Sequence, residues 1–250
     1  MTTHIKSILI FAILQLSISS WLSAEVTSAD LLKSSVTRLD GIDHEMNVDI
    51  LTTNSKEKKE NRKFNLSIHW DMNNDRYKMI FIKENNGKKN CLKAWAHHYT
   101  NDKVNKWVLL PKSGKIKNVT GKKTSEKLDL SEVSLSLDFL KKESAIKGEE
   151  LINDIFCHLV EVIDDDGMVK IWIDPIDFMV HKKEYYNKKS KLFKTVNFNT
   201  LVEEDGIKYY KEASIYNLKK KNKIDISVQG ISKKIFEDIG IFIPPLKDEN

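Results

Sequence analysis

Residues 148–198 read GEELINDIFCHLVEVIDDDGMVKIWIDPIDFMVHKKEYYNKKSKLFKTVNF, and this stretch decides the fold class. Between Phe156 and Ile163 two sets of side chains alternate at every second position, which is the pattern of a pleated strand. Asp164–Gly167 then supplies the residues of a tight turn, with Gly167 free to take a positive φ. The chain therefore reverses at this turn.

Further short strands follow at once. Met168–Trp172 returns, Asp174-Pro175 interrupts the pairing, Phe178–Tyr186 runs out again, and a Lys188–Ser190 turn brings Leu192–Phe198 back. Successive strands with such short connections are antiparallel neighbours. The stretch is therefore predicted to be an antiparallel meander of four strands.

The same strand pattern recurs on both sides of this meander, at residues 46–50, 64–70, 77–81, 92–99, 104–110, 207–218 and 224–230. Ser28–Asp40 has the cap, apolar stripe and terminal glycine of a helix. Shorter helices are expected within Ser131–Ser144 and at Ser232–Ile239. We predict a mainly β fold of about eleven strands, and a sheet this wide must curl or close.

The first 24 residues differ in composition from the rest. His4 and Lys6 precede an apolar run from Ile8 to Leu14, and small polar residues lead to Ala24. This order predicts a signal peptide at residues 1–24, followed by a single exported and soluble domain at residues 25–250.

The charge is only mildly basic. The 250 residues include 41 Lys and Arg against 36 Asp and Glu, a formal net charge of +5. A nucleic-acid-binding protein usually concentrates its basic residues in one stripe. Lysine is spread here through the loops, which favours a solvated surface and no nucleic-acid partner.

Residues with catalytic or metal-binding chemistry form no recognisable constellation. His97 and His98 are adjacent, so on a strand they point to opposite faces. Asp164–Asp166 is better explained as a hairpin turn than as a cation site. We expect no catalytic residue, no metal and no cofactor, and the protein is predicted not to be an enzyme. Cys91 and Cys157 are either free and buried or joined in one disulfide, and the sequence leaves both alternatives open.

Large apolar side chains gather in the predicted strands. They are explained either by an ordinary sheet core or by an apolar hollow that binds a large ligand. Within 64–70 the apolar residues share one face, and Asn65, Ser67 and His69 are expected to face solvent. The candidate ligand-binding residues are Phe64, Leu66, Ile68, Trp70, Tyr77, Met79, Phe81, Trp95, Trp107, Leu109 and Trp172.

Several segments resemble a known family in order and spacing. Trp107–Ile116 (WVLLPKSGKI) is similar to a W-x-Y-L-P-x-x-x-x-I/V stretch, with Leu109 in place of Tyr. Leu137–Leu140 is similar to a polar-Asp-Leu helix, and Gly148–Glu161 to a segment that leads into a Cys-x-x-x-Glu strand. Trp172–Asp174 and the later motifs complete the series (Lys182–Tyr186 and Lys191–Lys194, with Ser190 where Gly is usual). Together they resemble the LolA-like superfamily of bacterial outer membrane lipoprotein-sorting proteins.

The resemblance implies a half-open antiparallel β-barrel, with helices as a plug over an apolar concave face. It implies a periplasmic carrier of lipoprotein acyl chains or another lipid. Such a carrier would meet an inner-membrane transporter and an outer-membrane acceptor, with transient membrane contact only. The alternative is a non-catalytic envelope protein-interaction or stress-sensing module on the same fold, and a hydrolase is a weaker third.

Overall fold

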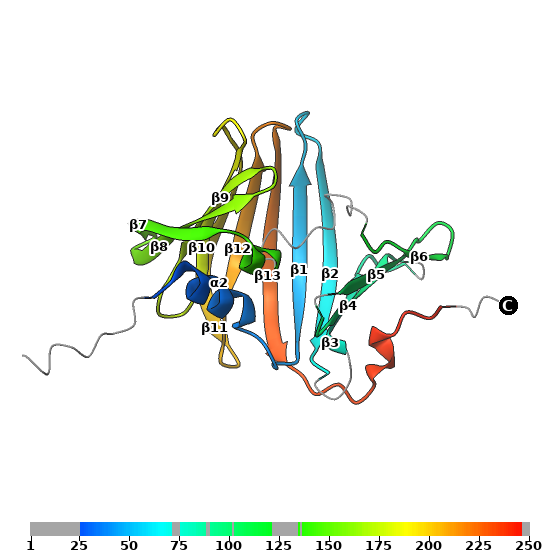
Figure 1. Cartoon of the computed structure of the whole chain (residues 1–250). Helices are drawn as coiled ribbons and strands as arrows, with labels where there is room; N and C mark the ends of the chain where they lie inside the picture. The colour runs from blue at the N-terminus through cyan, green and yellow to red at the C-terminus, as the bar shows by residue number, and fades with distance from the viewer. Residues whose placement is uncertain are drawn as a thin grey trace, which may run out of the picture.

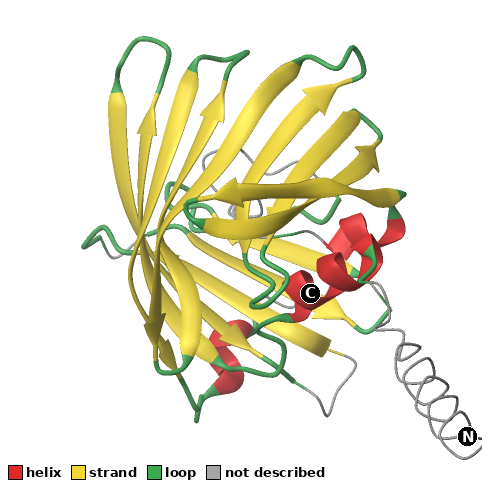
Figure 2. Cartoon of the chain, turned by 90° about the vertical axis from the view of Figure 1, so that its left-hand side faces the viewer, coloured by secondary structure: helices red, strands yellow, loops and turns green. Residues whose placement is uncertain are grey.

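The structure is a computed structural model, which describes residues 26–71, 76–88, 91–101, 103–121, 135 and 137–246. The predicted signal peptide and most of the polar stretch between Gly121 and Leu137 lie outside the described residues. Thirteen strands form one antiparallel sheet that curls on itself (Figures 1 and 2). Their order is β6-β5-β4-β3-β2-β1-β13-β12-β11-β10-β9-β8-β7. Within the described chain β6 and β7 do not pair with each other, so the barrel is open.

The strands are of ordinary length for the most part and pair with their sequence neighbours, except where β13 returns to β1. They are β1 His44–Thr53, β2 Lys59–His69, β3 Arg76–Glu84, β4 Lys93–Tyr99, β5 Val104–Leu109, β6 Ile116–Asn118, β7 Ser144–Ile152, β8 Ile155–Asp164, β9 Gly167–Ile173, β10 Val180–Asn187, β11 Leu192–Glu204, β12 Ile207–Asn217 and β13 Asn222–Lys233.

The turn between β8 and β9 forms where the sequence places it. Asp164 pairs with Gly167, and Gly167 has φ +148°. A Cβ at Gly167 would lie 2.0 Å from the Tyr186 carbonyl oxygen, so only glycine fits beside β10. The predicted meander is therefore confirmed, and β7 adds a fifth strand to it.

The expected number of strands, about eleven, was two too low. The three residues of β6 are too few to show a period, and they are held by pairing with β5. In β7, the register shifts between Ile146 and Gly148, and most side chains are exposed, so an apolar alternation is missing. The mainly β, half-open barrel is nevertheless confirmed.

Helix α2 (Ser28–Thr37) is the predicted N-terminal helix. Thr27 and Asp30 form a capping box, in which the Thr27 hydroxyl oxygen accepts from the Asp30 amide at 3.1 Å. The short 3₁₀ helix η3 (Leu137–Lys141) also lies within its predicted segment. No described helix combines the length and apolar character needed to cross a membrane.

The predicted final helix at Ser232–Ile239 is wrong. Strand β13 continues through Lys233, because Ser232 pairs with Glu45 and Lys233 with His44. A short 3₁₀ helix, η4 (Ile239–Phe242), follows, and the Asp238 side chain caps it. Pairing with β1 outweighs the weak local preference for helix.

Candidate functional site

Helix α2 lies against one face of the curled sheet, which we call the inner face (Figure 1). Leu31 and Leu32 are buried there against β8 and β9. Residues that pair across neighbouring strands lie on the same face of the sheet. Ile171 pairs with Lys183, Lys183 with Val196, and Val196 with Ile215. One continuous face therefore runs from the helix-covered strands to the middle of the barrel.

Beyond the helix, the inner face is apolar over β1, β2 and β11–β13. Its buried members form one cluster, namely Val48, Ile50, Phe64, Leu66, Leu92, Val196, Phe198, Ala213, Ile215 and Ile226. Half-buried apolar side chains pack against this cluster, namely Met46, Ile82, Val108, Val180, Tyr185, Tyr210, Ile224 and Val228. The inner face thus keeps accessible apolar surface, which neither α2 nor η3 covers completely.

A few charged groups are set into this apolar face. The Arg62 guanidinium lies 2.8 Å from Glu84 and 5.0 Å over the Phe64 ring. The hydrogen bond from Arg62 lowers the pKa of Glu84. Lys194 lies 3.7 Å from the centre of the Tyr185 ring. These contacts allow charged groups to remain beside apolar side chains.

The predicted ligand-binding residues of β2 lie on the inner face. Phe64 and Leu66 pair with Val48 and Met46 of β1 and belong to the same cluster. Ile68 is half-buried on the same side of the strand. Trp70 follows β2 directly, and its ring lies 4.9 Å from that of Tyr77.

The other predicted residues do not share this face. The register pairs Ser67 with Phe81, Phe81 with Trp95, and Trp95 with Trp107, so this row lies on the outer face. Met79 and Leu109 lie on the same side of their strands as this row. Trp172 is also outside, where its indole donates to Glu150 at 2.9 Å and Lys182 lies over its ring. The candidate ligand-binding residues are therefore divided between the two faces of the sheet.

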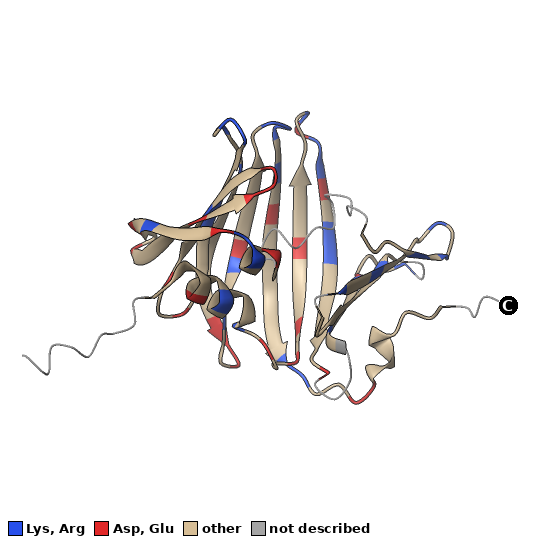
Figure 3. Cartoon of the chain, in the orientation of Figure 1, with Lys and Arg blue, Asp and Glu red and all other residues tan. Residues whose placement is uncertain are grey.

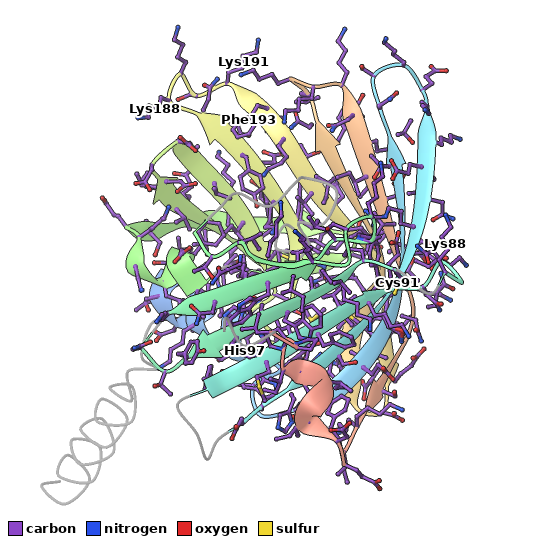
Figure 4. The ribbon with its side chains drawn as sticks, turned by 90° about the vertical axis from the view of Figure 1, so that its right-hand side faces the viewer. Lys88, Cys91, His97, Lys188, Lys191 and Phe193 are labelled. Carbon is purple, nitrogen blue, oxygen red and sulfur yellow. The ribbon has the colours of Figure 1, made fainter. Side chains whose placement is uncertain are left out.

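The cause is the C-terminal segment, residues 234–246, which covers the outer face of β3–β5 (Figure 4). Trp95 donates from its indole nitrogen to the Ile241 carbonyl at 2.9 Å. His97 donates from Nε2 to the Phe242 carbonyl at 2.7 Å. Because these strands carry large apolar side chains on both faces, such a side chain does not reveal which face is inner.

The expectation that Ser67 and His69 face solvent is wrong for both residues, and the C-terminal segment covers His69. Ser67 is only 3% exposed. His69 packs against Phe236 and Phe242, with ring centres 6.1 and 5.6 Å away, and its Nδ1 lies 2.5 Å from Asp43. Asn65, further along the strand, hydrogen-bonds Asn47 at 2.8 Å on the exposed part of the outer face.

A group of buried nitrogen atoms at one end of the inner face was not anticipated from the sequence. Lys78 pairs with His98 across β3 and β4, and its ammonium lies 4.9 Å over the Trp70 ring. Burial lowers the pKa of His98 to about 4, with smaller contributions from nearby cations. Burial also lowers the pKa of His44 and of Lys78. The protein therefore disfavours the charged form of all three side chains.

The surface of the described residues includes two hollows, neither of which is lined by the apolar cluster of the inner face. One of about 340 Å³ lies at the β4–β5 turn, lined by Tyr99, Thr100, Asn101 and Lys103. One of about 230 Å³ lies between the end of α2 and the β11–β12 turn, with Arg38, Asp177 and Lys208 in its wall. The first is polar, whereas Leu39, Ile42 and Ile207 give the second an apolar part. None of the predicted ligand-binding residues lines either hollow.

The remaining sequence candidates are accounted for separately. Cys91 and Cys157 are free and buried. They are not bonded here, because Cys91 precedes β4 and Cys157 lies in β8, strands that are far apart in the sheet order. His97 contacts the C-terminal segment outside, whereas His98 lies inside beside Lys78. Among the described residues, no group of three or more His, Cys, Asp or Glu is arranged to hold a metal ion.

Solved structures share this architecture, among them proteins from three bacteria. A DUF1329 family protein from Desulfovibrio piger has a TM-score of 0.72 at 17% identity, covering 86% of this chain and 95% of that one. A proposed outer membrane lipoprotein-sorting protein domain from Vibrio parahaemolyticus has 0.70 at 15%, with coverage of 86% and 95%. A LolA superfamily protein from Nitrosomonas europaea has 0.60 at 15%, with 88% and 98%.

The fold is therefore that of the LolA-like proteins, which confirms the resemblance seen in the sequence. A family model described as "-like: Uncharacterized protein" matches residues 73–242, and the chain belongs to that family. No curated protein matches the chain.

Proposed function

We propose that the protein is a periplasmic carrier, which binds the acyl chains of lipoproteins or another lipid on its inner face and contributes to outer membrane lipoprotein sorting without catalysis. One observation carries the proposal. Half-buried apolar side chains of six strands, such as Met46, Ile82 and Val228, line a continuous inner face in a fold shared with a proposed lipoprotein-sorting domain.

Burial of acyl chains on such a face is energetically reasonable. Each buried methylene group contributes about 0.8 kcal/mol, so a bound chain of a dozen carbons is stabilised by roughly 10 kcal/mol before ordering costs. The inner face offers branched aliphatic and aromatic contacts and needs no covalent chemistry. The phenylalanine and leucine of β2, Phe64 and Leu66, are the predicted ligand residues that belong to this face.

Entry and release of a bound lipid require access to the inner face past helix α2. Leu31 and Leu32 hold α2 on β8 and β9, and the Ser28 hydroxyl donates to the Ser144 carbonyl at 3.0 Å. Both contacts are local to one end of the barrel. Movement of α2 would uncover the strands beneath it and needs no cofactor.

The proposal includes export. Residues 1–24 act as a signal peptide that is removed, and residues 25–250 form the mature single domain. Mass measurement of the protein from a periplasmic extract tests this part. An intact Met1, or retention in the cytoplasm, would remove the periplasmic carrier from consideration.

The binding step is tested with a fluorescent fatty-acid probe and two glutamate variants. Ile82→Glu places a charge among the apolar side chains of the inner face and is expected to weaken probe binding at least tenfold. Ile163→Glu is the matched control, because Ile163 is exposed on β8. Circular dichroism must show that both variants are folded. Equal binding by folded Ile82→Glu would contradict the proposal.

A second function is favoured by the C-terminal segment, which exposes a run of apolar side chains, Ile235, Ile239, Ile241, Ile243 and Leu246. Such a surface suits a protein-interaction module, for example an envelope-stress sensor. Native mass spectrometry after gentle purification separates the two functions. Co-purified lipid supports the carrier, whereas a stoichiometric protein partner on a lipid-free chain supports the module.

A further inference from the structure

The antiparallel order of the strands places alternate turns at opposite ends of the barrel. The turns β1–β2, β12–β13 and β10–β11 follow strands that run in one direction, and their strands are contiguous in the sheet. In Figures 1 and 4 these three turns lie together at the upper end. We call residues 54–60, 187–191 and 217–223 the rim.

The rim is strongly basic, although the chain as a whole is not. It carries ten lysines against two glutamates, a net charge of +8 in a chain whose total is +5. All of these lysines are exposed, and Figure 3 shows the basic residues at this end. They are Lys56, Lys58, Lys59, Lys188, Lys189, Lys191, Lys219, Lys220, Lys221 and Lys223.

An asparagine organises each of the three turns in the same way. Asn54 accepts from the amides of Lys56 and Lys58 at 2.9 and 3.0 Å. Asn187 accepts from those of Lys189 and Lys191 at 2.9 and 3.1 Å, and Asn217 from that of Lys220 at 2.9 Å (the third turn). The backbone amides are thus satisfied within the turns. The lysine side chains project from ordered tips.

Most of these lysines are not neutralised by the protein itself. Lys223 forms an ion pair with Asp225 at 2.7 Å, and Lys220 also has an interaction partner within the protein. The other eight rim lysines form no ion pair within the described part of the chain. Their charge is therefore available to an external partner.

The opposite end of the barrel carries several acidic residues, together with the exposed Lys233 and Lys234. The β11–β12 turn carries Glu203, Glu204 and Asp205, all exposed. Glu237 and Asp238 follow β13 at that same end. One acidic turn, Asp164–Asp166 between β8 and β9, belongs by direction to the basic end. It adjoins the β10–β11 turn of the rim, because Gly167 pairs with Asn187, so its three aspartates reduce the net positive charge of this end.

From this arrangement we infer that the rim is a docking surface for an anionic lipid bilayer, whose phosphate head groups contact the lysines of the three turns. The inference rests on the proposed function in one respect, since a lipid carrier must reach a membrane. The inference adds that the rim end of the barrel contacts the membrane and that the lipids it contacts are anionic.

The chemistry of the rim favours a bilayer over other polyanions. Its cations are all lysine, which acts as a flexible point charge and suits mobile head groups, whereas nucleic-acid sites use arginine forks and stacked aromatic rings. An apolar side chain stands beside the lysines, since Leu218 is 42% exposed at the β12–β13 tip. Lysines with an adjacent exposed leucine are a combination that suits a membrane interface.

A backbone hydrogen bond joins this tip to its neighbour. The Leu218 amide donates to the Phe193 carbonyl at 2.8 Å, and Phe193 lies two residues beyond the β10–β11 turn. The lysines of the two turns are therefore held side by side. A bilayer surface can contact both turns at once without any rearrangement of the backbone.

Vesicle binding tests the inference with the purified chain. Vesicles of phosphatidylcholine alone are compared with vesicles that contain phosphatidylglycerol, at low and at high salt. We expect binding only to the anionic vesicles, and weaker binding at high salt. Each lysine near an anionic surface strengthens binding about fivefold, so replacing three should weaken it about 100-fold.

The rim variant is Lys188→Gln, Lys189→Gln and Lys191→Gln combined. Its control changes the net charge equally at exposed lysines away from the rim, as Lys33→Gln, Lys117→Gln and Lys211→Gln combined. The control is expected to lose less than about threefold. Equal losses in both variants, or equal binding to both kinds of vesicle, would overturn the inference.

Two further arms separate the remaining outcomes. Polyglutamate is added as a probe for acidic polypeptides. If the chain binds polyglutamate through the rim and does not bind anionic vesicles, the proposed membrane-docking role is wrong and the rim binds an acidic protein. The fatty-acid probe is measured on the same variants, and the rim variant is expected to bind it normally. If the chain binds anionic vesicles through the rim but does not bind the fatty-acid probe, the result supports membrane docking by the rim and contradicts the proposed carrier function. If the chain binds the probe but not the vesicles, the result contradicts membrane docking by the rim and is consistent with the carrier function.

Discussion

The C-terminal segment is expected to be part of the cooperative fold, and Phe242→Ala tests this. Phe242 has no exposed surface, and its ring lies 4.9 Å from Phe236 and 5.6 Å from His69. Truncation of a buried phenylalanine costs about 3–5 kcal/mol, because apolar contacts are lost and a cavity remains. We expect a loss near the lower end, about 3 kcal/mol, since a terminal segment can partly relax.

The assay is urea denaturation followed by tryptophan fluorescence. Trp95 reports directly, because its indole donates to the Ile241 carbonyl. Ile235→Ala is the matched control in the same segment, since Ile235 is 94% exposed and its loss should cost less than about 0.5 kcal/mol. A loss below about 1 kcal/mol for Phe242→Ala, with an unchanged Trp95 signal, would refute the docked segment.

The other predictions concern a turn, a buried histidine and the outer face. Gly167→Ala is expected to lower the free energy of unfolding by roughly 2–3 kcal/mol in urea denaturation, because a Cβ there meets the β10 backbone. Gly87→Ala has open space around the new Cβ and should lower the free energy of unfolding by only about 1 kcal/mol. The pKa of His98 is about 4 when folded and 6.5 ordinarily, so the unfolded chain takes up the proton first and stability falls as pH drops from 6.5 to 4. His98→Asn should flatten that fall by roughly 2–3 kcal/mol, measured as the pH dependence of unfolding, and an unchanged profile would contradict the assignment. Ser67→Glu should destabilise by roughly 3 kcal/mol because it buries a charge at a position that is 3% exposed and lies beside Glu45. Asn65→Glu should not destabilise, and equal melting temperatures of the two variants would count against the placement of Ser67.

Local patterns were sufficient for most of the fold. The alternation from Phe156 to Ile163 and the Asp164–Gly167 turn predicted a hairpin that the structure contains. Strand pairing across a tight turn depends on nearby residues alone. The helix α2 was also predicted, although its cap is Thr27 and not Ser28 as expected. The same reasoning failed for Ser232 and Lys233, whose strand is held by β1, at the other end of the chain.

The candidate site was predicted only in part, because the burial of a strand face depends on what lies over it. Phe64 and Leu66 were placed correctly, since β1 and β2 have one apolar face and one polar face. Trp95 and Trp107 were not, because the C-terminal segment packs on the outer side of their strands. An alternating pattern shows that two faces differ and does not show which is inside.

The rim lysines also show which properties follow from the sequence alone and which follow only from the tertiary structure. The sequence by itself determined that lysines are spread through the loops, as in the Lys188–Ser190 turn, and that the net charge is slight. Only the tertiary structure decided that three of these turns stand side by side while the acidic turn at Glu203–Asp205 lies at the other end. Turns far apart in the chain become neighbours through the order of the strands, and that order is set by long-range pairing such as β1 with β13.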